Sequence, residues 1–112
     1  NIFKNEKNHG ILQPTLFSSE RRILMFRMWG KILKDNRLLK DTVICQPDYS
    51  LSRTQMVFQS LTAICYEFDL GEPIWLDANV SDFQRHAKTR FTQDNFIEHL
   101  DFDYLEIQVI EE

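Results

Sequence analysis

Histidine is the side chain best suited to acid–base chemistry and metal binding near neutral pH, and one of the three histidines here lies among carboxylates. His99 stands in the segment EHLDFD, beside Glu98 and close to Asp101 and Asp103. This group could hold a divalent cation, or His99 could act as a base oriented by Asp101. A solvated surface of mixed charge would look the same in sequence. We therefore predict no catalytic residue, no cofactor and no metal site, with His99 and Asp101 as the residues that would be the ligands if a metal ion were bound.

Three basic residues, Arg85, Lys88 and Arg90, lie within the segment RHAKTR in the acidic part of the chain. Arg85 and Lys88 would be one turn apart on a helix and could bind a phosphate or a partner's carboxylate. Pairing with an acidic neighbour such as Asp82 would explain them equally well. With a net charge of −4, the chain lacks the broad positive surface of a nucleic-acid-binding domain, so we expect no nucleic-acid partner.

Trp29 lies between Arg27 and Lys31 in the segment RILMFRMWGKILK. An exposed tryptophan flanked by cations suits a partner-binding hot spot. The alternative is that Trp29 is covered by the N-terminal residues and only protects the sheet beneath it. Trp75, in the segment PIWL, is expected in the core.

A third candidate lies near the start of the chain, in GILQPTLFSS (residues 10–19). Gln13, Leu16 and Phe17 resemble the short peptides with which bacterial replication and repair proteins dock on the DNA sliding clamp. In such peptides the two apolar side chains enter a pocket and the glutamine hydrogen-bonds at its rim. Leu16 and Phe17 would serve equally well to cover the face around Trp29.

The composition indicates one ordered domain rather than a membrane or disordered chain. Of 112 residues, 43% are hydrophobic and 27% charged, which is typical of a globular core. No apolar run reaches the ~18 residues of a membrane span, and no apolar segment follows the first lysines, so we expect neither a membrane helix nor a signal peptide. Cys45 and Cys65 lie in apolar runs with spacing unsuited to zinc, and we expect buried free thiols in the cytoplasm. Glycine-rich phosphate loops, serine-elbow motifs and His-Glu-x-x-His are absent from the sequence.

The elements that would position these side chains begin with a β-hairpin. Asp35-Asn36 separates two runs rich in branched and aromatic residues, which predicts a tight turn at this pair. Pairing Lys34 with Arg37 and counting back without interruption puts three apolar pairs on one face: Ile32 with Leu39, Met28 with Val43, and Phe26 with Cys45. The other face would collect Arg27, Trp29, Lys31, Lys40 and Thr42. Gly30 would face Asp41, a gap that would mark a bulge.

A helix follows the hairpin. Ser52 and Gln55 form a capping-box pattern, and the helix should end near Asp69, before Gly71 and Pro73. Its inward face should consist of residues at helical spacing: Val57, Leu61, Ile64, Cys65 and Phe68.

The remaining elements alternate between the two types. PIWL predicts a short strand, and Asn79 with Asp82 predicts the start of a second helix with Val80, Phe83 and Ala87 inward. Thr92 could cap a further helical turn carrying Phe96 and Ile97. The segment DFDYLEIQVI alternates and predicts a strand with Leu105, Ile107 and Val109 on the dry face and Tyr104, Glu106 and Gln108 on the wet face.

These elements predict an α+β fold: a mostly antiparallel sheet of about four strands, with the hairpin and the last strand, and two or three helices on one face. Residues 1–19 are expected to form an arm and 20–112 a single domain. Residues 1–40 hold nine Lys/Arg and three Asp/Glu, whereas 41–112 hold four and fourteen. If the last strand lies beside the hairpin, Glu106 would face Arg27 or Lys31 across strands.

The segments WGKILKDNRLLKDTVI and TRFTQDNFIEHLDFDYLEIQVIEE resemble a family of short, uncharacterised bacterial proteins found mainly in anaerobic Gram-positive bacteria. The resemblance covers residues from about 22 to the end. It implies a cytoplasmic bacterial protein and brings no assigned activity.

Two functional hypotheses follow. The first is a non-enzymatic interaction or regulatory module that binds a protein through the Trp29 face, the arm or an edge strand, with homodimerisation through an edge strand as a variant. The second is a small enzyme or metal-binding protein that uses His99 and its neighbouring carboxylates. Clamp docking through Gln13, Leu16 and Phe17 is a further alternative.

Overall fold

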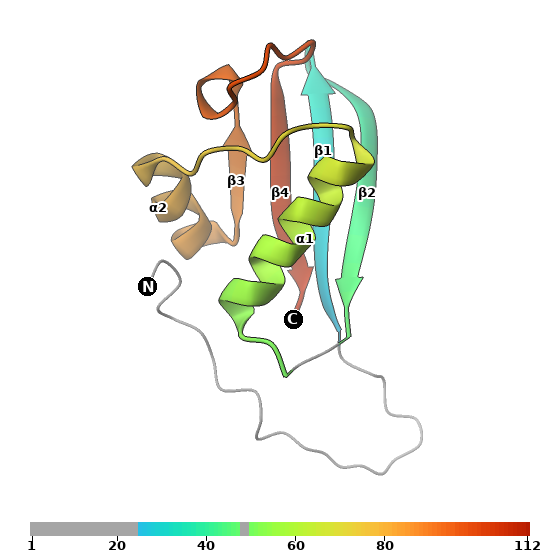
Figure 1. Ribbon diagram of the computed structural model, residues 1–112, viewed down its shortest axis with the longest axis vertical. Helices are drawn as coiled ribbons and strands as arrows, with labels where there is room; N and C mark the ends of the chain where they lie inside the picture. The colour runs from blue at the N-terminus through green and yellow to red at the C-terminus, as the bar shows by residue number, and fades with distance from the viewer. Residues whose placement is uncertain (1–24, 48–49) are drawn as a thin grey trace.

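The computed structural model describes residues 25–47 and 50–112, and it has the expected α+β architecture (Figure 1). The predicted arm, with Gln13, Leu16 and Phe17, lies outside the described residues. The elements in chain order are β1 (Phe26–Lys34), β2 (Arg37–Gln46), α1 (Arg53–Glu67), α2 (Asp77–His86), β3 (Lys88–Phe91), the 3₁₀ turn η2 (Gln93–Asn95) and β4 (Tyr104–Glu111). The strands form one sheet in the order β2-β1-β4-β3, in which all neighbours are antiparallel.

The hairpin turn forms where the sequence predicted it. Asp35 and Asn36 have φ angles of 53° and 65°, as a tight primed turn requires, and Lys34 pairs with Arg37. Beyond the turn the predicted register is wrong by one residue. A bulge makes Leu39 the extra residue of β2, so that Leu33 pairs with Leu38 whereas Ile32 pairs with Lys40.

The bulge changes which side chains share a face. Met28 pairs with Ile44 rather than Val43, and Phe26 pairs with Gln46 rather than Cys45. Lys40 and Thr42, expected on the wet face, therefore lie on the helix side, where the Thr42 hydroxyl donates to a Glu67 carboxylate oxygen at 2.9 Å. Val43 and Cys45 move to the opposite face. Gly30 pairs with Thr42 and does not mark a bulge.

Helix α1 confirms its prediction closely. Gln55 N–H donates to the Ser52 hydroxyl at 3.1 Å, and Ser52 N–H donates to the Gln55 side chain at 2.9 Å, completing the capping box. All five residues of the predicted inward face are buried: Val57, Leu61, Ile64, Cys65 and Phe68. The helix ends at Glu67, and Asp69 has a φ of 59°.

The segment after α1 differs from its prediction. PIWL (73–76) forms no strand, and instead the Ile74 N–H donates to the Asn95 carbonyl at 2.7 Å. Trp75 is partly buried against the core, with edge-to-face ring contacts at centroid distances of 5.1–5.8 Å to Phe58, Phe83 and Phe91. Trp75 therefore packs between α1, α2 and β3. This packing holds the segment in place without strand pairing.

Helix α2 begins two residues earlier than expected, at Asp77, and ends at His86, followed by the C-cap residue Ala87, whose φ is 55°. Lys88 then starts β3, a strand that sequence patterning did not identify. Thr92 caps the 3₁₀ turn as expected, but Phe96 follows the turn and the side chain of Ile97 is 94% exposed.

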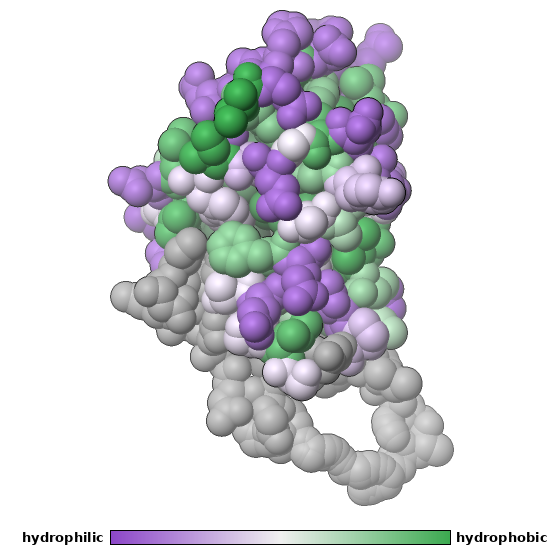
Figure 2. Space-filling model, in the orientation of Figure 1, coloured by the Kyte–Doolittle hydropathy of each residue, from purple (hydrophilic) through white to green (hydrophobic). Residues whose placement is uncertain are grey.

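Strand β4 confirms the central expectation that the tail of the chain completes the sheet beside the hairpin. Leu105 and Ile107 are fully buried against the helices, and Lys31 pairs with Glu106 as expected. Among residues 25–47 and 50–112, neither helix combines the length and apolar composition that crossing a bilayer requires. On the helix side, apolar side chains gather in separate small groups among hydrophilic ones (Figure 2).

Candidate functional site

One face of the sheet has no helix over it in the described part of the chain. Both helices pack on the face formed by Phe26, Met28 and Ile32 of β1 and their neighbours (Figure 1). We call the opposite surface the open face; its side chains are Arg27, Trp29, Lys31 and Leu33 of β1, Asp41, Val43 and Cys45 of β2, Lys88 and Arg90 of β3, and Tyr104, Glu106 and Gln108 of β4.

Trp29 lies in the middle strands of this face in a fixed orientation. Its indole Nε1–H donates to a carboxylate oxygen of Asp41 at 2.8 Å. The Lys31 ammonium lies over the ring, 4.0 Å from its centroid. Val43, the strand partner of Trp29, leaves 43% of its surface exposed. The ring is thus held by one hydrogen bond and one cation, with an exposed apolar side chain next to it.

Glu106 connects the centre of the open face to its β3 side. It is only 6% exposed, and its two carboxylate oxygens contact Lys31 at 3.2 Å and Arg90 at 3.1 Å. The Arg90 guanidinium also lies 4.6 Å from the Tyr104 ring centroid. Asp41, Trp29, Lys31, Glu106, Arg90 and Tyr104 therefore form one continuous chain of contacts across all four strands. Such a chain fixes the side chains before any partner binds.

Arg27 lies at the end of the open face near the start of β1. Its guanidinium donates to Glu111 at 2.6 Å and contacts the Cys45 sulfur at 3.4 Å. Its side chain is 40% exposed. The three residues of the predicted interaction cluster, Arg27, Trp29 and Lys31, thus lie together on one face, as alternation along a strand requires.

The predicted anion-binding residues are divided between two elements. Arg85 lies in the last turn of α2, whereas Lys88 and Arg90 lie on β3, so the expected helical spacing of Arg85 and Lys88 is wrong. The left-handed conformation at Ala87 ends the helix between them. Lys88 is exposed and has no ion-pair partner among the described residues, which leaves it as a free cation of the open face.

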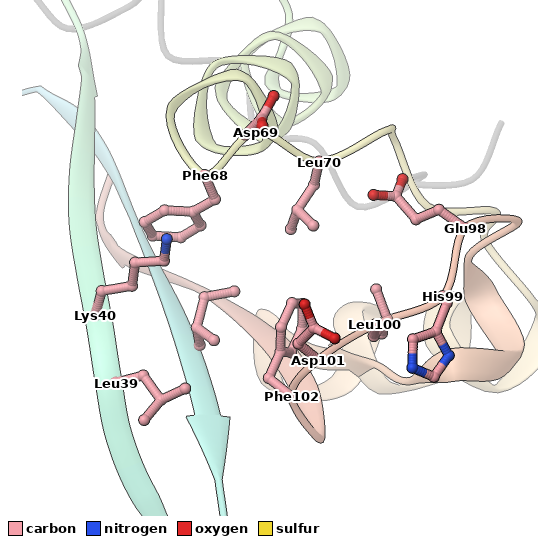
Figure 3. A pocket seen from close by; sticks show the side chains of 11 residues that line it. Leu39, Lys40, Phe68, Asp69, Leu70, Glu98, His99, Leu100, Asp101 and Phe102 are labelled. Atoms are coloured by element: carbon pink, nitrogen blue, oxygen red, sulfur yellow. The ribbon is translucent and has the colours of Figure 1, made fainter.

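His99 and Asp101 line a shallow cavity of about 410 Å³ at the other end of the molecule, on the helix side (Figure 3). Its floor is apolar, formed by Ile32, Phe68, Leu70, Leu100 and Phe102. His99 lies across the cavity from Lys40, which itself lies over the Phe68 ring. Glu98 is occupied, because its carboxylate accepts the Gly71 N–H at 2.8 Å. Within the described residues, no group of three His, Cys, Asp or Glu side chains is placed to hold a metal ion.

The two cysteines differ in environment. Cys65 is buried as expected, and burial, followed by the charges of Glu72 and Glu98, raises the pKa of its thiol to about 12. Cys45 is exposed, contrary to the prediction, because the Leu39 bulge places it on the open face beside Arg27. Neither thiol forms a disulfide.

Sequence reasoning found the centre of the open face but missed Asp41, Tyr104 and the role of Arg90. Asp41 was missed because the register of β2 is shifted by one residue, so that Asp41 pairs with Lys31 and not with Gly30. The missing signal for Arg90 was the strand KTRF, whose threonine and phenylalanine alternate with two basic residues. The chain matches no family model, no curated protein and no solved structure. Function is therefore inferred from the geometry of the open face and the cavity.

Proposed function

We propose that this protein is a non-enzymatic interaction module whose open face binds an acidic protein surface. The observation that carries this proposal is the continuous chain of contacts from Asp41 through Trp29 and Glu106 to Tyr104, on a sheet face that no described helix covers. Interfaces are strongest where a rigid aromatic side chain and arginines lie at the centre of a surface patch. Trp29 supplies the aromatic side chain at the centre of the open face, and Arg27 supplies an arginine on the same strand toward one end of it.

The charge of the open face supports an acidic partner. Of the carboxylates on or beside the open face, Glu106 is nearly covered, Glu111 is held by Arg27, and the exposed Asp41 accepts the Trp29 indole hydrogen bond. By contrast, Lys88 is exposed and the Arg90 side chain is 62% exposed. The groups that reach solvent are therefore mainly cationic, in a protein whose net charge is −4. Complementary charge would steer an acidic partner to this face.

A nucleic acid is a less suitable partner because the aromatic rings already carry cations. Lys31 lies over Trp29 and Arg90 lies over Tyr104. Single-stranded nucleic acids bind sheets by stacking bases on exposed ring faces. Stacking here would first have to displace a cation from each ring.

Differential affinity capture tests the proposal. The wild-type protein, Trp29→Ala, Lys88→Glu and the control Tyr66→Ala would each be immobilised and exposed to the same lysate, with and without nuclease. Tyr66 is a matched control because its side chain is 87% exposed on α1, on the other side of the sheet. We expect an acidic protein that wild type and Tyr66→Ala retain and both open-face variants lose. Retention by all four, or loss on nuclease treatment, would contradict the proposal.

A second candidate uses the cavity, where His99, Asp101 and Lys40 surround an apolar floor. Its size falls within the range of small-molecule sites. A metal ion would find only these two ligands here, because no third His, Cys, Asp or Glu among the described residues is placed to join them. Titration with Zn²⁺ tests the pair directly: it should shift the His99 ring resonances in wild type and not in Asp101→Asn if these two residues bind it together. Unchanged resonances in wild type would remove this candidate. Clamp docking through Gln13, Leu16 and Phe17 stays a prediction.

A further inference from the structure

The two edges of the sheet differ in how they are protected. β3 has four residues, and α2 packs along it. The carbonyl of Arg90, which points out of the sheet, accepts a hydrogen bond from the Asn79 side chain at 2.9 Å. β2 has ten residues, and α1 covers only its inner face. Proteins usually shorten, cover or charge their edge strands to prevent pairing with another chain.

The direction of the β2 main-chain groups follows from the neighbouring strand. Asp103 N–H donates to the Leu33 carbonyl at 2.9 Å, so the main-chain groups of Leu33 face β4. Direction alternates along a strand, and therefore Met28, Gly30 and Ile32 face β2. On β2, the main-chain N–H and C=O groups of the partners of Met28 and Gly30 therefore point toward β1. The main-chain groups of the residues that alternate with these partners point away from β1, beyond the edge of the sheet: Asp41, Val43 and Cys45.

In the part of the chain that the structure describes, these outward N–H and C=O groups have no hydrogen-bond partner. The segment DTVICQ (41–46) also carries one charge, no proline and three β-branched residues. The bulge at Leu39 and the cations Arg37 and Lys40 protect only the first half of the strand. The second half is a regular edge with high β propensity.

We propose that β2 pairs with β2 of a second copy of this chain, antiparallel and about a two-fold axis through Val43, to form a continuous eight-stranded sheet. This goes beyond the proposed function, because the pairing needs no other partner. Antiparallel partners must lie on the same face, so a two-fold axis must pass through a single residue of the regular half.

Two other positions for the axis are unfavourable. An axis at Asp41 opposes two carboxylates on the same face. An axis at Thr42 places Val43 opposite Asp41 and Ile44 opposite Lys40, so that each branched apolar side chain faces a charge.

The axis at Val43 gives compatible neighbours along the whole segment. Val43 lies opposite Val43 of the second copy, Thr42 opposite Ile44, Asp41 opposite Cys45 and Lys40 opposite Gln46. No like charges are opposed, and no branched apolar side chain faces a charge. The main-chain groups of Val43 already point outward, so the two central residues would exchange two hydrogen bonds.

This register also aligns the two open faces. Trp29 is the strand partner of Val43, so the row across the dimer reads Trp29, Val43, Val43, Trp29. The two half-exposed valines would bury each other between the two tryptophans, extending one apolar row across the two-fold axis. A second copy is therefore a complementary occupant of this edge.

The solution mass of the full 112-residue chain tests the pairing. Sedimentation equilibrium should give a dimer of the 13.4 kDa chain, with a dissociation constant on the order of 1–100 µM, as expected for a small interface. Val43→Pro removes an outward N–H without removing a bond to β1, and Val43→Lys opposes two cations. Both should be monomeric, whereas the control Leu38→Lys, an exposed residue outside the paired segment, should remain dimeric.

Cross-linking tests the register without relying on the folding of those variants. Val43→Cys in a Cys45→Ser background should form an intermolecular disulfide on oxidation, because hydrogen-bonded partners lie about 5.5 Å apart between Cα atoms. Leu38→Cys in the same background should not. A wild-type protein that is monomeric at every concentration would overturn the proposal. So would a dimer that survives both Val43 substitutions, or one that cross-links through position 38 and not 43.

Discussion

The Asn79 side chain donates a hydrogen bond to the main-chain carbonyl of Arg90 at 2.9 Å, and in doing so covers the outer edge of β3. The same amide donates to the Thr89 hydroxyl at 3.0 Å and accepts from Leu76 N–H and from the Asn95 side chain. One buried residue thus holds the start of α2, the edge strand and the 3₁₀ turn together. No equivalent residue among those described covers β2, which leaves the outer edge of that strand open.

Asn79→Ala should be strongly destabilising. Asn79 is 6% exposed and makes four hydrogen bonds, and its removal leaves the Arg90 carbonyl and the Asn95 amide short of partners. Buried groups left unpaired cost about 1–3 kcal/mol each, so we expect a loss of about 2–4 kcal/mol in the free energy of unfolding. Urea denaturation measures it. Gln59→Ala, on the exposed face of α1, is the control and should change stability by less than about 0.5 kcal/mol.

Gly30→Ala should destabilise because α1 lies close to β1 at this point. A Cβ atom on Gly30 would come within 2.6 Å of the Ile64 side chain. Overpacking of this kind costs about 1–3 kcal/mol. Ile64→Ala removes the clashing atoms, so its own cost should be smaller in the Gly30→Ala background than in wild type. A double-mutant cycle measures this coupling. Additive effects of the two substitutions would show that the helix does not approach the strand at Gly30.

Glu106 should matter more for stability than Arg90, although the two form one ion pair. Glu106→Ala leaves the Lys31 ammonium, whose side chain is 17% exposed, without its carboxylate, which should cost about 1–3 kcal/mol. The Arg90 side chain is 62% exposed, and exposed pairs contribute about 0–1 kcal/mol. Thermal or urea unfolding of the two variants gives the comparison. A larger loss for Arg90→Ala would mean that Glu106 is not held mainly by Lys31.

Stability should fall at alkaline pH partly because of Cys65. Burial raises the pKa of its thiol from its ordinary value near 9 to about 12, so the folded protein keeps the proton after the unfolded chain has lost it. The contribution is therefore fully present below pH 9 and declines as the pH rises toward 12, with a slope of up to about 1.4 kcal/mol per pH unit.

The measurement for Cys65 is urea unfolding between about pH 8 and pH 10.5. Cys65→Ala should lose stability with pH less steeply than wild type, whatever its absolute stability. Cys45→Ala, which alters the exposed thiol, should keep the wild-type slope. Equal slopes in all three proteins would contradict the assignment.

The sequence predicted the elements whose signals are local. The Asp35-Asn36 turn, the capping box of α1 and the alternation in β4 each depend on residues within one element, and all three formed as expected. The prediction failed where pairing or burial came from distant residues. Nothing near Leu39 in sequence marks the bulge, yet that one extra residue decided the faces of Val43 and Cys45.

The residues of the candidate site also divide into those that a local pattern predicts and those that depend on pairing with distant residues. Arg27, Trp29 and Lys31 share a face because they alternate along one strand, which the sequence shows directly. Asp41 depends on the register of β2, and Arg90 depends on a four-residue strand next to a helix end. For PIWL the error was to predict a strand that does not form. Trp75 in this segment is held by ring contacts rather than by strand pairing.

The most direct test of the free β2 edge is amide hydrogen exchange resolved by residue along Asp41–Gln46. Thr42 and Ile44 face β1 and should exchange slowly at every protein concentration. The Val43 amide points away from the sheet and should be protected at concentrations where the dimer forms, then exchange rapidly on dilution. A Val43 amide that exchanges rapidly at all concentrations, or that stays protected in the dilute monomer, would contradict the account.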